Sequence, residues 1–172
     1  MKVIFLDHDG VICLSQQWGG RFKKPGFDSN PETPLDIRMD NFDKKAIKVL
    51  NEIIEITGAE IVVSSDWKRW GTLDQMKEMY TIRGVKPPID LTPDLKDFDL
   101  ETHGLLSWKS QPETIRVIEI EEWLKKHPEV THWVAIDDMD LSKLDNFILT
   151  ARPFSEGIKQ SGLKSKILNF LS

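Results

Sequence analysis

The stretch Val3-Ile4-Phe5-Leu6-Asp7-His8-Asp9-Gly10-Val11 decides the fold expected for this chain. Its first four residues form a continuous apolar run, which is typical of a short strand buried on both faces of a parallel sheet. Two acids and a glycine follow within four residues. Open parallel sheets bind ligands at the carboxyl ends of their strands, so the stretch predicts both a sheet and a site at its edge.

Beyond this stretch, predicted strands alternate with predicted helices. Strands are expected at 60–63, 133–136 and 147–149, and helices at 43–57, from Thr72 to Gly84, from Pro112 to before Pro128, and at 162–171. This alternation predicts parallel β-α-β units. We therefore expect an α/β fold, a Rossmann-like three-layer parallel sheet with helices on both faces.

The length of 172 residues suits one ordinary domain. Residues 14–41 are rich in Gly, Pro, Asn and Asp, and are expected to form an irregular insert too short to fold alone. Residues 66–115 hold one predicted helix and a proline-containing connection, and are expected to form a partial lid or loop. The prediction is a single domain over 1–172 with a fairly open site and no full cap domain.

Composition limits the classes of function. The net charge of -5 argues against sequence-independent coating of nucleic acid, although a locally basic site remains compatible with it. The single cysteine, Cys13, excludes an internal disulfide and a thiolate zinc cluster, and it suits a reducing cytoplasm. No apolar run approaches the roughly 18 residues of a membrane helix, so no membrane association is expected.

Polar pairs follow three of the predicted strands where each strand ends: Asp7 and Asp9, Ser64 and Ser65, and Asp137 and Asp138. The carboxyl ends of parallel strands meet at one edge, so these side chains are expected in one crevice. Four carboxylates there would repel one another without a cation between them. Oxygen ligands of this kind suit Mg²⁺, which commonly bridges to a substrate phosphate.

Phosphoryl transfer is the chemistry that such a site supports. A carboxylate can attack phosphorus to form an aspartyl phosphate, and an acid two residues further on can protonate the leaving oxygen and then activate water. The hydroxyl of Ser64 and a cation such as Arg116 can hold the transferring oxygens. Lys109 is the alternative cation.

These motifs resemble those of the haloacid dehalogenase (HAD) superfamily. The segment 7–11 resembles its first motif, 61–64 its second and 134–138 its fourth, and Arg116 sits where the superfamily carries Lys or Arg. A closer resemblance is to the HAD domain of Swiss Army Knife RNA repair proteins. It is carried by 64–68, by Thr92-Pro93 and by 119–124, with Lys68 in place of that family's Arg.

The resemblance implies a role for each site residue. Asp7 would be the nucleophile and a metal ligand, and Asp9 the general acid and base that also gives its backbone carbonyl to the metal. Asp137 and Asp138 would hold Mg²⁺ directly or through water, and which does which is open. Phosphate would be gripped by Ser64, Ser65, Gly10 and Arg116, although Ser65 could instead cap the following turn.

Asp9 favours a phosphatase, because pump ATPases of this superfamily carry Thr at that position and dehalogenases lack the acid. The substrate is expected to be a phosphorylated molecule, either a nucleic-acid end or a small nucleotide. A non-catalytic phosphate-binding or signalling module is the alternative from another class. The basic and aromatic segment 18–24 is either a nucleic-acid guide beside the site or a surface loop anchored by its aromatics.

Overall fold

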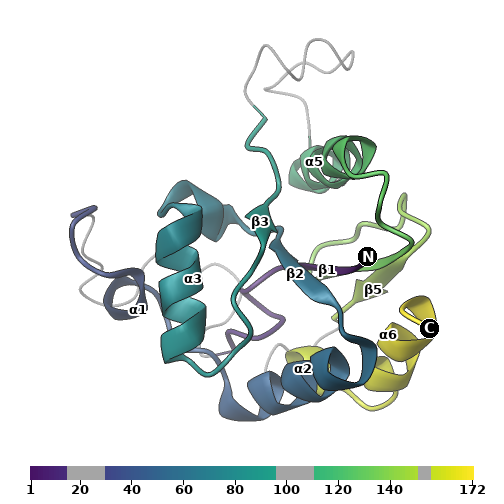
Figure 1. Ribbon diagram of the computed structural model, residues 1–172, viewed down its shortest axis with the longest axis horizontal. Coiled ribbons are helices and arrows are strands. Elements are labelled where there is room, and N and C mark those ends of the chain that lie inside the picture. Colours follow the sequence, from purple (N-terminus) through teal and green to yellow (C-terminus); the bar gives the residue numbers. More distant parts are fainter. Residues whose placement is uncertain (15–29, 96–110, 151–155) are drawn as a thin grey trace.

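A computed structural model of the chain describes residues 1–14, 30–95, 111–150 and 156–172. Its centre is a five-stranded, all-parallel sheet with the strand order β3-β2-β1-β4-β5 (Figure 1). The strands are β1 (Lys2–Leu6), β2 (Glu60–Val63), β3 (Asp90–Leu91), β4 (His132–Asp137) and β5 (Phe147–Leu149). The predicted parallel α/β sheet is confirmed.

Helices cover both faces of this sheet, as predicted. The helices are α1 (Leu35–Arg38), α2 (Lys44–Thr57), α3 (Leu73–Ile82), α5 (Pro112–Lys126) and α6 (Leu163–Phe170), with short 3₁₀ helices η1 (Asp66–Arg69) and η3 (Gly157–Lys159). Helix α5 packs on one face, and α2, α3 and α6 pack on the other. Figure 1 shows α5 on the opposite side of the strands from α2 and α6.

Local signals explain why the helices begin and end where the sequence predicts. The Asp43 side chain caps α2 by accepting hydrogen bonds from the backbone N–H groups of Lys45 and Ala46, and Gly58 ends it with a φ of 69°. Thr72 and Gln75 form a reciprocal capping box at the start of α3. These caps satisfy backbone groups that a helix terminus leaves unpaired.

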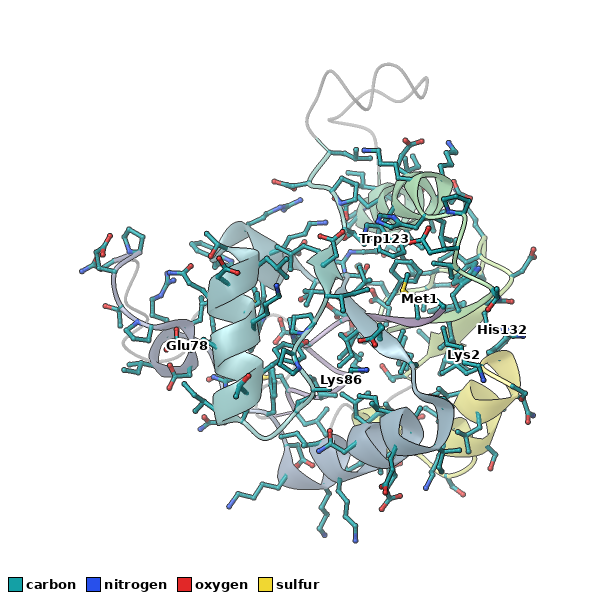
Figure 2. The ribbon with its side chains drawn as sticks, in the orientation of Figure 1. Met1, Lys2, Glu78, Lys86, Trp123 and His132 are labelled. Atoms are coloured by element: carbon teal, nitrogen blue, oxygen red, sulfur yellow. The ribbon has the colours of Figure 1, made fainter. Side chains whose placement is uncertain are left out.

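Side chains along β1 alternate between the two layers of the core. Val3 and Phe5 pack against α5, where the Trp123 ring meets Phe5 edge-on with 5.3 Å between ring centroids. Figure 2 labels Trp123 between α5 and the strands. Ile4 and Leu6 belong to the opposite core under α2, α3 and α6. By the same alternation, the residue after Leu6 faces the α5 side and the next one faces α3.

Strand β3 is the main difference from the sequence prediction, which expects only a proline-containing connection after the helix within 66–115. This strand is two residues long, and Pro87, Pro88 and Pro93 flank it, so no periodicity reveals it. Pairing with β2 defines it, through Val62 opposite Asp90 and Val63 opposite Leu91. Helix α3 is therefore the crossover between β2 and β3. Residues 66–91, which the sequence predicts to be part of the lid, thus form this crossover and the strand β3.

Several expectations fall on parts of the chain outside the described residues. Residues 96–110 of the expected lid, with Lys109, and segment 15–29, with the basic and aromatic cluster, lie outside the described residues. Within the described part of the insert, 30–41, α1 forms one short helical turn. No helix among the described residues is both long and apolar enough to cross a membrane.

Ile53 and Ile56 on α2 provide a matched test of this packing. Ile53 is fully buried, whereas Ile56 is 61% exposed. Ile53→Ala should lower the free energy of unfolding by about 2–5 kcal/mol because it leaves a cavity under the helix. Ile56→Ala should change it by no more than about 0.5 kcal/mol. Urea denaturation measures both, and equal losses would contradict the orientation of α2.

Candidate active site

The residues at the carboxyl ends of the three central strands lie side by side at one edge of the sheet. The parallel register pairs Leu6, the last residue of β1, with Val63, the last residue of β2, and with Ile136, the residue before the end of β4. The ladder continues beyond them, because the Asp7 amide donates to the carbonyl of Ile136 at 3.1 Å and the Ser64 amide donates to that of Leu6 at 2.9 Å. Asp7, Ser64 and Asp137 are thereby brought together, as the sequence predicts.

Three carboxylates form a compact group at this edge. One oxygen from each of Asp7, Asp137 and Asp138 lies within 4.8 Å of the others. Asp7 and Asp137 are buried, and Asp138 is half-buried. A donor set made only of carboxylate oxygens fits a hard divalent cation such as Mg²⁺.

Arg116 reaches this group from α5 and is itself almost fully buried. Its Nη1 donates to Asp7 Oδ1 at 3.3 Å, to Asp137 Oδ2 at 3.1 Å and to the carbonyl of Ser64. Its Nη2 donates to Asp66 Oδ1 at 3.2 Å. The guanidinium therefore bridges the predicted nucleophile and a predicted metal ligand, at the position expected of the phosphate-binding cation.

Burial and mutual repulsion control the charges of these groups. Burial raises the pKa of Asp7, and the Arg116 guanidinium opposes that rise. Burial and the neighbouring Asp7 raise the pKa of Asp137 well above its usual range, again against Arg116. Burial disfavours the charge of Arg116, but Asp137 and Asp7 outweigh it and raise the pKa of the guanidinium. A divalent cation would relieve the repulsion between the carboxylates, so the site fits the metal electrostatically as well.

The two serines after β2 have different surroundings. Ser64 Oγ is buried and has no hydrogen-bond partner among the described residues. Such a hydroxyl suits an acceptor that arrives with the substrate, for example a phosphoryl oxygen. The Ser65 hydroxyl accepts a hydrogen bond from the amide of Trp67 at 3.4 Å, and its interaction with Asp7 opposes the rise in the pKa of that carboxyl group. Ser65 thus caps η1, which is the alternative role predicted for it, and it also interacts with Asp7, the predicted nucleophile.

Gly10 packs directly against a metal-ligand candidate. Its φ is 72°, and a Cβ built on it would lie 2.7 Å from both Cβ and Oδ2 of Asp138. The Gly10 amide donates to the carbonyl of Cys13 at 3.0 Å, so a phosphate contact by this residue stays a prediction. What the geometry requires of residue 10 is the absence of a side chain.

Asp9 is half-buried, and its Oδ2 accepts a hydrogen bond from the indole Nε1 of Trp67 at 2.8 Å. His8, between the two acids, is expected to point out of the site. It is fully buried, and its Nε2 pairs with the Tyr80 hydroxyl at 2.6 Å. Desolvation in this core lowers the pKa of His8 well below its usual value. His8 is therefore a neutral core residue.

Comparison with known families decides the identity of this arrangement. Residues 3–160 match the family model described as the HAD domain in Swiss Army Knife RNA repair proteins. The chain belongs to this HAD family. No curated protein and no solved structure shows a significant match to it. Membership indicates a hydrolase that acts on a phosphorylated substrate, and the acidic cluster of this HAD domain matches the divalent metal that the family typically uses.

The HAD domain also contains a buried charge network for which sequence reasoning assigned no role. Lys68 Nζ donates to Glu119 Oε2 at 2.5 Å, to Thr92 Oγ1 at 3.0 Å and to the carbonyl of Pro93 at 2.8 Å. Glu119 Oε2 lies 3.8 Å from Arg116 Nε. All three ammonium donors have acceptors within the protein, so Lys68 stabilises the surroundings of Arg116.

One signal in the sequence could have revealed this network. The segments that carry the resemblance to this HAD family, 64–68, 92–93 and 119–124, are the segments that meet there. Lys68 and Glu119 lie far apart in the chain, and neither belongs to a superfamily motif. A buried charge requires a partner, but the sequence does not say which one.

A pocket of about 170 Å³ opens beside Arg116. It lies between η1 and the start of α5, and its lining residues are Asp66, Arg69, Pro112, Ile115, Arg116 and Glu119. Ligand pockets for small molecules usually enclose about 300–1,000 Å³. This pocket, formed by described residues, is therefore too small to enclose a nucleotide.

Gly10 and Gly58 provide a matched pair of substitutions. Both have positive φ, 72° and 69°, so alanine should destabilise either site by about 1–2 kcal/mol. Only at Gly10 does the new Cβ collide with Asp138, since nothing lies within 4 Å of the Gly58 position. Gly10→Ala should therefore lower metal-dependent phosphatase activity by about 10–100-fold. Assays over a Mg²⁺ series together with thermal unfolding test this, and a similar loss of activity in Gly58→Ala would contradict it.

Proposed function

We propose that this HAD domain is a Mg²⁺-dependent phosphohydrolase that works through an aspartyl phosphate on Asp7. The observation that carries the proposal is the surroundings of the Asp7 carboxylate. It lies within 4.8 Å of the carboxylate oxygens of Asp137 and Asp138, and 3.3 Å from Arg116 Nη1. A nucleophilic carboxylate, two further metal ligands and a cation for phosphate are thus within reach of one phosphoryl group.

The metal would be held by Asp7, Asp137 and Asp138, with the backbone carbonyl of Asp9 as the further ligand that the resemblance implies. When bound, Mg²⁺ neutralises the charge that accumulates on the phosphoryl oxygens. Arg116 contributes to the same end from the protein side. Its charge opposes the effect of burial on the pKa of Asp7 and so favours the ionised, nucleophilic form.

In the first half-reaction, a carboxylate oxygen of Asp7 attacks phosphorus while the bond from phosphorus to the leaving oxygen breaks. Asp9 gives its proton to that oxygen, so the product departs as a neutral alcohol. Arg116 and the Ser64 hydroxyl hold the transferring oxygens in place. The result is a phosphoryl group on Asp7 and an ionised Asp9.

In the second half-reaction, the ionised Asp9 accepts a proton from water as the water oxygen attacks phosphorus. The bond between phosphorus and Asp7 breaks, and inorganic phosphate leaves. Asp7 is a carboxylate again and Asp9 is protonated again, so the enzyme returns to its starting state. Each acid thus has a separate role in the cycle.

Phosphorylated nucleic-acid ends are the substrate class that we propose. The matched family is described by its occurrence in RNA repair proteins. Between β2 and α5, the described residues add only η1, α3 and β3, and the last of these belongs to the main sheet. Together with the small pocket beside Arg116, this favours a site open to the end of a long chain over one that encloses a free nucleotide.

The metal and the two acids of the first motif have separable effects. A chelator should abolish activity and Mg²⁺ should restore it, whereas restoration by zinc alone would contradict the metal assignment.

Asp7→Asn should eliminate turnover because the nucleophile is lost, and Asp9→Asn should lower the rate by about 10²–10⁴-fold. Asp140→Asn, an exposed acid in the loop after β4, is the matched control and should keep full activity.

The substrate class is tested by comparing kcat/KM for RNA oligonucleotides carrying a 3′- or 5′-phosphate with kcat/KM for the corresponding nucleoside monophosphates. We expect the higher values for one of the oligonucleotides, because a site open to a chain end binds nucleotides beyond the terminal phosphate. p-Nitrophenyl phosphate serves as a control for the intact chemical step. Higher values for the monophosphates would assign the HAD domain to small nucleotides instead.

A further inference from the structure

The indole of Trp67 lies against the predicted general acid. Trp67 belongs to η1, which follows β2, and its Nε1 donates to Asp9 Oδ2 at 2.8 Å. The side chain is only 3% exposed. No catalytic role of the superfamily motifs described above uses this contact.

The ring of Trp67 is fixed by an aromatic group within the core. The His8 imidazole stacks on it with 4.4 Å between ring centroids and an interplanar angle of 27°. His8 is held in turn by its 2.6 Å hydrogen bond to Tyr80 and by stacking on Phe42. The backbone of Trp67 is anchored separately by the Ser65 cap. The indole N–H is therefore presented to Asp9 from a rigid support.

The chemistry of the indole makes the two oxygens of Asp9 unequal. An indole N–H is a donor and has no acceptor, so it bonds an oxygen that carries no proton of its own in that direction. Oδ2 therefore presents a lone pair to the indole, whether Asp9 is ionised or protonated. The acidic proton of Asp9 therefore does not point toward the indole, and the carboxyl group is held in one orientation by this hydrogen bond.

We propose that Trp67 is a positioning residue that holds Asp9 by Oδ2 and so orients the carboxyl group that exchanges the proton with the leaving group and with water. This inference rests on the phosphatase function proposed above. It also gives His8 a role, because the residue between the two acids supports the tryptophan that orients the second one. The first motif and η1 thus act as one unit.

The test is Trp67→Phe, which keeps an aromatic ring and removes the N–H. The informative quantity is kcat/KM. It reports the steps from substrate binding to departure of the leaving group, and it does not depend on the later hydrolysis of the aspartyl phosphate. A phosphorylated oligonucleotide releases an alkoxide that needs the proton, so kcat/KM should fall about 10- to 100-fold. p-Nitrophenolate leaves as a stable anion, so kcat/KM for p-nitrophenyl phosphate should stay nearly unchanged.

Trp123→Phe is the matched control. Trp123 is also 3% exposed, and its Nε1 donates to Asp90 Oδ2 at 2.6 Å, so its substitution removes an equivalent indole–carboxylate hydrogen bond that does not involve Asp9. It should leave the ratio of the two kcat/KM values at its wild-type level. Equal losses on both substrates in Trp67→Phe, or the same selective loss in Trp123→Phe, would overturn the inference.

A double substitution separates positioning of Asp9 from any general effect. In an Asp9→Asn background, Trp67→Phe should cause no further selective loss, because both changes act on one proton transfer. If the selective loss in the double variant equals the product of the losses in Asp9→Asn and Trp67→Phe, the inference is overturned and the phosphatase function is not affected. A wild-type protein without any phosphatase activity would overturn the proposed function, and the inference with it.

A final measurement needs no substitution of Trp67. The proton resonance of its indole N–H should shift in Asp9→Ala, whereas that of Trp123 should stay in place, because only the first hydrogen bond loses its acceptor. This result would support the inference even if Trp67→Phe does not fold. An unchanged Trp67 resonance would overturn it.

Discussion

The register of the parallel strands β2, β1 and β4 is the constraint on which the site depends. Leu6 pairs with Val63 on one side and with Ile136 on the other, so Asp7, Ser64 and Asp137 lie at the same level of the sheet. Side chains alternate along each strand, which turns the next residue of each chain toward the face covered by α5. A shift of one residue in β1 would turn Asp7 toward α3 and away from Arg116.

This geometry concentrates charge in a place where charge is costly. Burial and mutual repulsion disfavour ionised Asp7 and Asp137, and Arg116 offsets part of that cost by contacting both. The Arg116 guanidinium also contacts Glu119, which is itself paired with the buried Lys68. Such an arrangement is a poor way to stabilise a fold. It is a suitable way to keep the proposed nucleophile and the proposed phosphate-binding cation in fixed contact beside the proposed metal site.

The sequence predicts the elements whose signals are local and misses those that depend on distant partners. The apolar run before Asp7 and the capping box at Thr72 are readable within a few residues, and both are confirmed. Strand β3 exists only through its pairing with β2, and two residues between prolines carry no periodicity. The contacts of Trp67 with Asp9 and of Lys68 with Glu119 join positions 58 and 51 residues apart, which no spacing rule connects.

The central claim is that Asp7 carries the phosphoryl group during turnover. The most direct measurement is acid quenching during turnover of a phosphorylated substrate with Mg²⁺, followed by mass spectrometry of the phosphorylated peptide. The account predicts a hydroxylamine-labile phosphoryl group on Asp7, at higher occupancy in Asp9→Asn, because the second acid activates the water that removes it. A phosphoryl group on another residue, or turnover by Asp7→Asn at the wild-type rate, would contradict the account.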